Sequence, residues 1–219
     1  MAQIFSRNAN VHARVTIFGA VVLICGAGWA TNEIFWSPYT TYVGVPLNQP
    51  VPFSHKHHVA EDGIDCRYCH TSVEKSRFAG MPTSETCMHC HSQIFSDVPL
   101  LAPVRESLAT NTPLKWNRVH DLPDYVYFDH SVHVAKGIGC STCHGRVDQM
   151  PITWRVNTLY MKWCLDCHSN PQKFVRPRDK VFDMAWQPPA NQKAESARLV
   201  GRYHIDTSGR LTNCSTCHR

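Results

Sequence analysis

One long apolar segment lies near the start of the chain, and the remainder shows little regular apolar periodicity. Residues 15–30 are almost wholly apolar or small, and residues 15–32 carry no charge. With residues 34–36 beyond Glu33, the segment reaches about 20 residues, the length that spans a bilayer as a helix. The pattern therefore predicts a transmembrane anchor helix over residues 15–36.

The flanks of this segment predict its orientation. Arg7 and Arg14 precede it with no acidic residue beside them, and basic residues tend to stay on the cytoplasmic side. The distal end carries aromatic side chains that suit a membrane interface, namely Trp29, Trp36, Tyr39 and Tyr42. We expect residues 1–14 in the bacterial cytoplasm and residues after the anchor on the periplasmic side of the inner membrane. A cleaved signal peptide is the alternative, but the apolar stretch is long for one.

The rest of the chain predicts short helices and irregular loops. Residues 37–52 contain four prolines and predict a linker that leaves the membrane. Residues 92–127 and 171–200 are rich in proline and scattered charge, which favours extended segments, with one short helix around residues 194–202. No alternating pattern typical of a strand is present.

Composition shows that aliphatic side chains alone do not fill the interior. The 14 prolines, 11 glycines, 14 histidines and 11 cysteines leave few long apolar segments. Ten of the eleven cysteines form C-x-x-C pairs, and a histidine follows each pair. We number these five motifs along the chain: motif 1 (residues 66–70), motif 2 (87–91), motif 3 (140–144), motif 4 (164–168) and motif 5 (214–218).

Five C-x-x-C-H motifs point to covalent haem. Disulfides do not require a histidine after each pair, structural zinc uses C-x-x-C pairs in twos, and a thioredoxin-like pair occurs once in a βαβ context. C-x-x-C-H attaches a c-type haem through two thioethers and one axial histidine. The attaching residues are then Cys66, Cys69, Cys87, Cys90, Cys140, Cys143, Cys164, Cys167, Cys214 and Cys217, and the proximal ligands are His70, His91, His144, His168 and His218.

A repeat surrounds the first four motifs. Phe53, His55 and His58 precede motif 1 as Phe128, His130 and His133 precede motif 3, at an offset of 75 residues. Each copy continues to a second motif, so residues 53–91 and 128–168 predict a duplicated two-haem unit. Residues 201–219 add a fifth haem. We therefore expect short helices and loops packed on five covalent haems in a periplasmic domain over residues 53–219.

Distal ligands are needed to close each iron as an electron carrier. His55 and His130 lie about ten residues ahead of their own motif, so we expect each to reach its own iron. His58 and His133 lie one helical turn further on, and we expect them to bridge to a neighbouring haem. The fifth position is open between His120, Met161 and His204, in that order of preference.

Charge favours haem over nucleic acid as the reason for the basic residues. The chain carries 22 basic and 17 acidic side chains, a formal charge of +5. Five haems, each with two propionates, add about −10 at neutral pH. The basic residues form no run of like charge, and we read them as propionate partners. The sequence therefore predicts a chain of closed haems that conducts electrons and does not bind nucleic acid.

These motifs resemble known multihaem families. The F-x-H-x-x-H and C-x-x-C-H pattern is similar to class III and c7-type cytochromes. The anchor, the five motifs, and the stretches at residues 120–130, 163–168 and 214–219 together resemble the pentahaem cytochrome c subunit of bacterial alternative complex III. That resemblance implies a quinol:electron-acceptor oxidoreductase. Its partners would be integral quinol-binding subunits, an iron–sulfur protein and a monohaem cytochrome c. The alternatives are a membrane quinol dehydrogenase cytochrome that feeds a periplasmic reductase, and a haem enzyme with an open iron.

Overall fold

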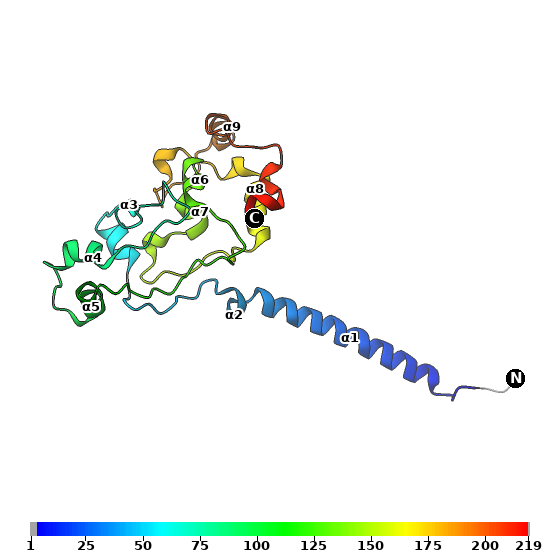
Figure 1. Ribbon diagram of the computed structural model, residues 1–219. Helices are drawn as coiled ribbons and strands as arrows, with labels where there is room; N and C mark the ends of the chain where they lie inside the picture. Colours follow the sequence, from blue (N-terminus) through cyan, green and yellow to red (C-terminus); the bar gives the residue numbers. More distant parts are fainter. Residues whose placement is uncertain (1–3, 219) are drawn as a thin grey trace. The chain divides into compact units, whose positions relative to one another are not determined.

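The protein divides into two compact units, residues 1–43 and 44–219. The computed structural model describes residues 4–218 (Figure 1), so residues 1–3 and 219 lie outside the description. The division falls earlier than the expected start of the haem domain at residue 53. The reason lies in the contacts of residues 44–46, described below.

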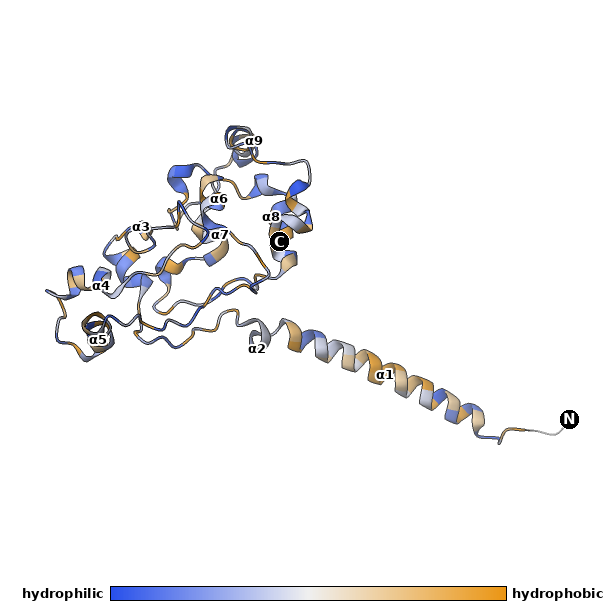
Figure 2. Cartoon of the chain, viewed as in Figure 1, coloured by the Kyte–Doolittle hydropathy of each residue, from blue (hydrophilic) through white to orange (hydrophobic). Residues whose placement is uncertain are grey.

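The first unit is built on the long helix α1 (Ala9–Trp36), followed by the single turn α2 (Pro38–Thr41). Helix α1 is long and apolar enough to cross a membrane, and none of its residues is buried. Figure 2 shows mainly apolar colouring over the middle of the helix, with hydrophilic residues toward its ends. The helix begins six residues before the predicted residue 15, because residues 9–14 contain no glycine or proline to stop it. It ends at Trp36, just before Pro38, because proline has no backbone N–H and its ring clashes with the preceding turn inside a helix.

Residues 44–46 belong to the second unit rather than to a free linker. The backbone N–H of Gly44 donates to the carbonyl oxygen of Arg155 at 2.8 Å, and Pro46 forms an isolated antiparallel bridge with Trp154. Residues 44–46 of the segment predicted to be a linker, 37–52, are therefore attached to the second unit. Pairing with a segment about 110 residues away in the sequence leaves no local pattern to reveal it.

The second unit consists of short helices and loops. Its α-helices are α3 (Cys66–Cys69), α4 (Ser84–His91), α5 (Ala102–Thr110), α6 (His130–Ala135), α7 (Cys140–His144), α8 (Met161–Ser169), α9 (Gln192–Arg202) and α10 (Cys214–Cys217). A π-helix, η1 (Lys56–Glu61), and five 3₁₀ turns complete it: η2 (Pro99–Leu101), η3 (Val147–Gln149), η4 (Pro171–Lys173), η5 (Arg178–Lys180) and η6 (Arg210–Thr212). The described residues form two isolated bridges and no named strand. The expected architecture of short helices and loops is confirmed, and α9 lies where the short helix around residues 194–202 was expected. The packing on five haems stays a prediction.

Helix α5 corrects the expectation of extended chain over residues 92–127. Pro103 lies in its first turn, where the missing N–H costs nothing. Arg105 and Glu106 are good helix formers, and Asn111 ends the helix in the left-handed conformation with φ 51°. Because prolines lie on either side of this segment, the sequence pattern predicted extended chain and not a short helix.

Two aspartates start the helices that carry candidate ligands. The Asp65 side chain accepts the N–H of Arg67 at the start of α3. The Asp129 side chain accepts the N–H groups of Ser131 and Val132 at the start of α6. Such caps satisfy backbone donors that a helix leaves open and contribute about 1 kcal/mol each. They fix the direction of helices too short to be stable alone.

The apolar core of the second unit is small. One cluster joins Ile138, Val175, Leu199 and Tyr203, with two further side chains packed against it. Ten apolar side chains are buried across the described residues, few for a unit of this length. The interior is therefore not closed by aliphatic packing, which fits a fold completed by prosthetic groups.

Candidate metal centre

The ten paired cysteines are all free thiols in this structure. Burial raises the pKa of Cys140 and of Cys167 to about 11, and the pKa of Cys143 to about 12. These thiols stay protonated at neutral pH, whereas a thiolate is the form that binds metal. No group of three or more His, Cys, Asp or Glu side chains among the described residues is placed to hold a metal ion.

The motif histidines are held so that one ring nitrogen stays available. Four of them donate Nδ1–H to a backbone carbonyl: His70 to Gly80 at 2.7 Å, His91 to Ile94 at 3.2 Å, His168 to Leu211 at 2.9 Å and His218 to Tyr125 at 3.1 Å. A hydrogen bond at Nδ1 fixes the tautomer and leaves the Nε2 lone pair free to bind a metal. This is the usual support of a metal-binding histidine.

The four histidines ahead of the motifs are held in the same way. Three donate Nδ1–H to a carbonyl: His58 to Ser54 at 2.9 Å, His130 to Arg77 at 2.8 Å and His133 to Asp129 at 2.6 Å. The Nδ1 of His55 lies 2.9 Å from the hydroxyl of Thr153. Eight histidines thus share a backbone or hydroxyl support at Nδ1 and offer Nε2.

Three histidine pairs have the spacing of two axial ligands on one metal. The ring centroids are 6.1 Å apart for His58 and His91, 6.3 Å for His130 and His144, and 6.2 Å for His133 and His168. Bonds of about 2.0 Å on each side, plus about 1 Å from nitrogen to centroid, separate two axial rings by roughly 6 Å. The residues present therefore fit a six-coordinate haem iron between each pair.

His55 lies in the neighbourhood of His70, its expected partner. Burial lowers the pKa of His55 to about 4, and the nearby His70 is the next cause. Burial likewise lowers the pKa of His144 to about 3. Both imidazoles are therefore neutral at neutral pH, as a metal ligand must be.

The two copies of the repeat have the same ring geometry. Phe53 stacks on His58 at 4.4 Å and meets His55 edge-on at 4.9 Å. Phe128 stacks on His133 at 4.6 Å and meets His130 edge-on at 4.8 Å. The phenylalanine thus sets the angle between two histidines one turn apart, so that they face different motifs.

None of the three fifth-ligand candidates lies against His218. No ring contact or hydrogen bond in residues 4–218 joins His218 to any of them. The ring of His120 lies 4.2 Å from that of His144, too close to hold a metal between them, and its buried Nε2 has no partner. Met161 is 66% exposed, and His204 is exposed with φ 50°.

The structure adds supporting residues that no sequence pattern marked. Thr153 supports His55 across 98 residues of sequence. Tyr68, inside motif 1, bonds His89, inside motif 2, at 3.0 Å. His89 is thus a contact between two motifs rather than an uninvolved residue. Only tertiary packing brings these pairs together.

Arg176 is a buried cation beside motif 3. It is 5% exposed, and its Nη2 donates to the hydroxyls of Ser141 and Thr142, each at 3.2 Å. Its guanidinium lies 4.4 Å from the centre of the Trp186 ring, and its Nε has no partner. A Cβ on residue 139 would overlap the guanidinium, so any larger residue at Gly139 would push the Arg176 side chain aside. Burial lowers the pKa of Arg176, but an arginine stays charged.

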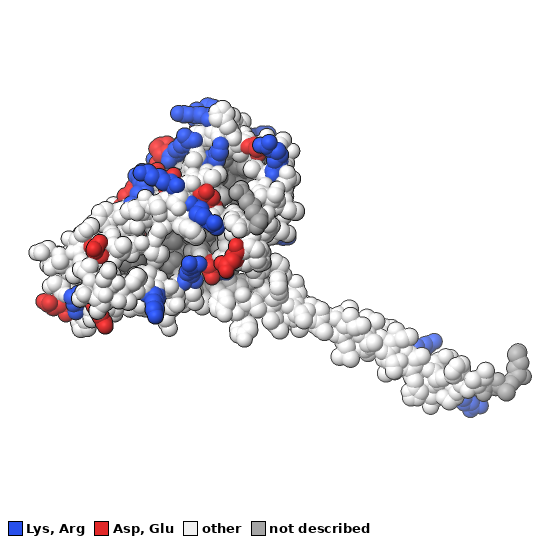
Figure 3. Space-filling model, in the orientation of Figure 1, with Lys and Arg blue, Asp and Glu red and all other residues white. Residues whose placement is uncertain are grey.

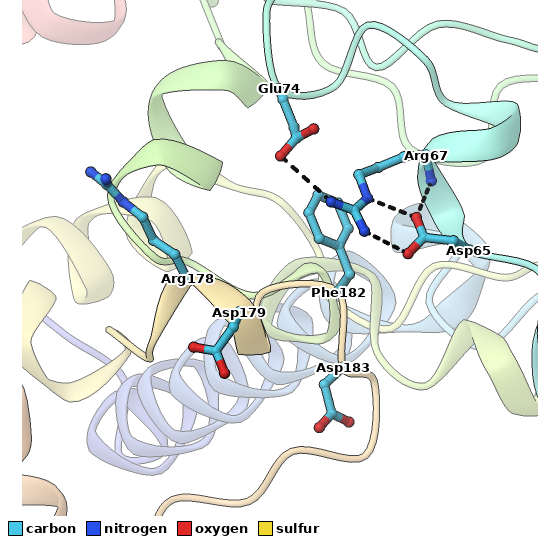
Figure 4. A pocket seen from close by; sticks show the side chains of 7 residues that line it. All are labelled: Asp65, Arg67, Glu74, Arg178, Asp179, Phe182 and Asp183. Carbon is cyan, nitrogen blue, oxygen red and sulfur yellow. Dashed lines mark hydrogen bonds and ion pairs between the residues drawn. The ribbon is translucent and has the colours of Figure 1, made fainter.

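A polar cavity of about 480 Å³ lies apart from the histidine pairs (Figure 4). Asp65 holds Arg67 through two oxygens at 2.8 Å, and the Arg67 guanidinium stacks on Phe182 at 4.6 Å. The Arg67 hydrogen bond is the first cause that lowers the pKa of Asp65. These charges pair with one another, so the cavity gives no reason to place a substrate there. On the face of the second unit in Figure 3, basic and acidic side chains are interspersed.

Two comparisons bear on this arrangement. The family described as cytochrome c7 and related cytochrome c matches residues 51–103 and 126–219, which contain all five motifs. The multiheme cytochrome c subunit of a menaquinone reductase from Nitratidesulfovibrio vulgaris is 35% identical over 173 residues, covering 69% of this chain and 79% of that protein. His120 falls in the part between the two matched ranges.

Proposed function

Because the chain belongs to the family of cytochrome c7 and related cytochromes c, we propose that it carries electrons through five covalent haems in a membrane quinone oxidoreductase. The observation that carries this proposal is the set of three histidine pairs with ring centroids 6.1–6.3 Å apart. Each pair joins a motif histidine to a histidine from a leader segment, by which we mean residues 53–65 ahead of motif 1 or residues 125–139 ahead of motif 3. A closed six-coordinate iron exchanges electrons and binds no substrate. The multihaem subunit of a menaquinone reductase, named as such, is a relative.

The roles of the residues follow from their positions. The ten paired cysteines form the thioethers, and the motif histidines are the proximal ligands. In our proposal His55 is the distal ligand for motif 1, His58 for motif 2, His130 for motif 3 and His133 for motif 4. Haem bound there supplies one-electron chemistry, and the protein supplies fixed imidazoles with neutral Nε2 atoms. We propose no independent catalytic site on this chain.

The ligand of the fifth iron is proposed to be Met161. Helix α8, which begins at Met161, packs against η6, the turn that precedes motif 5. The exposed thioether is free to turn, whereas His120 is packed against His144. This reverses the order of preference from the sequence. A methionine ligand raises the potential of a haem relative to a second histidine.

Helix α1 is proposed as an uncleaved anchor, with residues 44–219 on the periplasmic side. Arg7 and Arg14 on its N-terminal side support this orientation. We propose a complex of the alternative complex III kind. Integral quinol-binding subunits and an iron–sulfur protein supply electrons, and a periplasmic cytochrome c or an equivalent carrier accepts them. The relative's printed name describes the reverse direction, so direction is the first property to test.

The test uses the native complex and the purified chain under anaerobic conditions. Menaquinol is added to each, and the absorbance of reduced haem is followed. We expect reduction in the complex and none in the chain alone, which dithionite must still reduce as the control. Haems that menaquinol leaves oxidised, but that a periplasmic donor reduces and menaquinone then reoxidises, would show the opposite direction. The proposal fails if neither treatment changes the haems of the complex.

The runner-up is a quinol dehydrogenase cytochrome that acts without other membrane subunits. The same experiment separates it, because menaquinol would then reduce the isolated chain. A haem enzyme, the third class, would show a high-spin iron that binds cyanide in the oxidised holoprotein. Co-purification from native membranes adds a second measure, since recovery of this chain alone would count against a complex.

A further inference from the structure

We propose that the five motifs form one linear series in the order 2, 1, 3, 4, 5, so that electrons enter and leave at motifs 2 and 5. The order in space thus differs from the order in the sequence. This inference rests on the proposed function and deepens it, because it names the two ends where partners must dock. In Figure 1 α4, α3, α7, α8 and the C-terminus follow one another across the second unit.

Motif 2 contacts motif 1 directly. The hydroxyl of Tyr68 bonds Nδ1 of His89 at 3.0 Å, and both residues lie between the cysteines of their motifs. The ring of His58, from the leader of motif 1, lies 6.1 Å from that of His91. Two attachment loops and one bridging histidine therefore join motifs 1 and 2.

Motif 1 meets motif 3 through a reciprocal pair of contacts. His130, ahead of motif 3, donates to the carbonyl of Arg77, which follows motif 1. His55, ahead of motif 1, bonds Thr153, which follows motif 3. The N–H of Lys56 also donates to the carbonyl of Met150 at 3.1 Å.

Motif 4 follows motif 3 in the series. His133, from the leader of motif 3, lies 6.2 Å ring to ring from His168. The Asn157 amide donates to the carbonyl of Cys143 at 3.2 Å. The segment between these two motifs therefore folds back on motif 3.

Motif 5 closes the series against motif 4. His168 donates to the carbonyl of Leu211 in η6, three residues before motif 5, and α8 packs on η6.

The contacts also indicate which motifs are not neighbours in the series. In the part of the chain that the structure describes, no hydrogen bond or ring contact links motif 2 to motif 3. Motif 5 has a second contact, because Tyr127 donates its N–H to the carbonyl of Cys217 at 2.7 Å and His218 donates to Tyr125. Those two tyrosines belong to the leader of motif 3 and not to the motif itself. A branch from motif 3 to motif 5 is therefore the alternative that the experiment must separate.

Each step along the series moves one electron, oxidising one iron and reducing the next, and no bond is made or broken. A quinol at one end would release two electrons and two protons, and a one-electron carrier at the other end would turn over twice. Electron transfer requires neighbouring haems, so removal of an inner haem isolates everything beyond it. Removal of an end haem isolates nothing.

The experiment compares two double variants of the full-length holoprotein. C66A/C69A removes the haem of motif 1, and the matched control C87A/C90A removes that of motif 2. Haems are reduced by a flash-activated external donor, and equilibration among them is followed by absorbance. We expect one haem in four to drop out of the fast phase in C66A/C69A and none in the control. Sequence order predicts the opposite, because loss of motif 2 would then isolate motif 1.

A third variant, C164A/C167A, tests the far end. The linear order predicts that motif 5 drops out of fast equilibration, whereas a branch from motif 3 keeps it connected and overturns the order. If a variant does not mature, iron anomalous scattering from crystals of the unaltered holoprotein decides. The iron of motif 1 should then lie nearest to those of motifs 2 and 3, and motif 5 nearest to motif 4. If all the remaining haems of C66A/C69A equilibrate in the fast phase, the proposed order is refuted. The menaquinol experiment, which tests the proposed function, is independent of that outcome.

Discussion

Replacing His133 by alanine should change the spin state of a haem that is not the one nearest in sequence. His133 lies seven residues ahead of motif 3, but its ring faces His168 of motif 4 at 6.2 Å. Its Nδ1 is held by the carbonyl of Asp129 at 2.6 Å, so the ring cannot turn without losing that hydrogen bond. We therefore expect His133→Ala to open the iron of motif 4 and to leave that of motif 3 closed.

The size of the effect follows from the pairing. If His133 serves one iron only, one haem in five becomes high-spin and about a fifth of the low-spin signal disappears. His133 is half-buried, so imidazole added to the solution can reach the space left by its ring. Addition of imidazole should restore the low-spin signal. A purely structural role for His133 would not produce rescue by the free ligand.

The assay is electron paramagnetic resonance of the oxidised holoprotein, supported by its optical spectrum. His57→Ala is the matched control, because His57 is exposed and pairs with Glu61 and Asp62. Combining His133→Ala with removal of Cys164 and Cys167 should abolish the new high-spin signal. If the signal survives that removal, His133 serves another iron and the bridging assignment is wrong. If His133→Ala stays fully low-spin, His133 is no ligand at all.

Three further predictions address the rest of the second unit. Arg176→Gln should lower one haem potential by about 70 mV, since a unit charge roughly 10 Å from an iron at an effective dielectric constant of about 20 contributes about 1.7 kcal/mol. Arg176→Lys should keep most of the potential, and Arg198→Gln, a change of an exposed arginine on α9, should keep all of it in redox titration; equal shifts in all three would contradict us. Thr153→Val removes the hydroxyl that supports His55, so one low-spin signal should shift at unchanged haem content; an unchanged spectrum would exclude that support. A chain starting at Gly44 behind an export signal should be soluble with all five haems, because the two units are compact separately; retention in the membrane fraction would refute this.

The sequence could supply the parts of the site that depend on local spacing. C-x-x-C-H and F-x-H-x-x-H place reacting groups within one or two helical turns, and Asp129 caps the helix that presents His130 and His133. The residues with the required chemistry are therefore close together in the sequence, and residue type and spacing are enough to predict them. The small apolar core was also foreseeable from composition, since the interior could not be filled by aliphatic side chains.

What the sequence could not supply depends on contacts between distant segments. Thr153 has no sequence feature that marks it as the partner of His55. The acceptor for His130 is the backbone carbonyl of Arg77, and since every residue has such a carbonyl, the sequence cannot mark this one. Helix α5 was hidden because its stability comes from packing and capping rather than from a periodic pattern. His120 was preferred for motif 5 by its setting in the sequence, but tertiary packing puts it against His144.

In the proposed series, the junction between motifs 1 and 3 would join the two copies of the duplicated unit into one chain of haems. Within each copy the second histidine of F-x-H-x-x-H ties the two motifs of that copy together, as His58 and His133 do. The first histidine is instead supported by the segment that follows the other copy's first motif, His55 by Thr153 and His130 by Arg77. This exchange of equivalent contacts is what a two-fold association of identical subunits produces. Two copies joined face to face bring their first motifs together in the middle, so the second motifs lie outward, and motif 5 extends one end only.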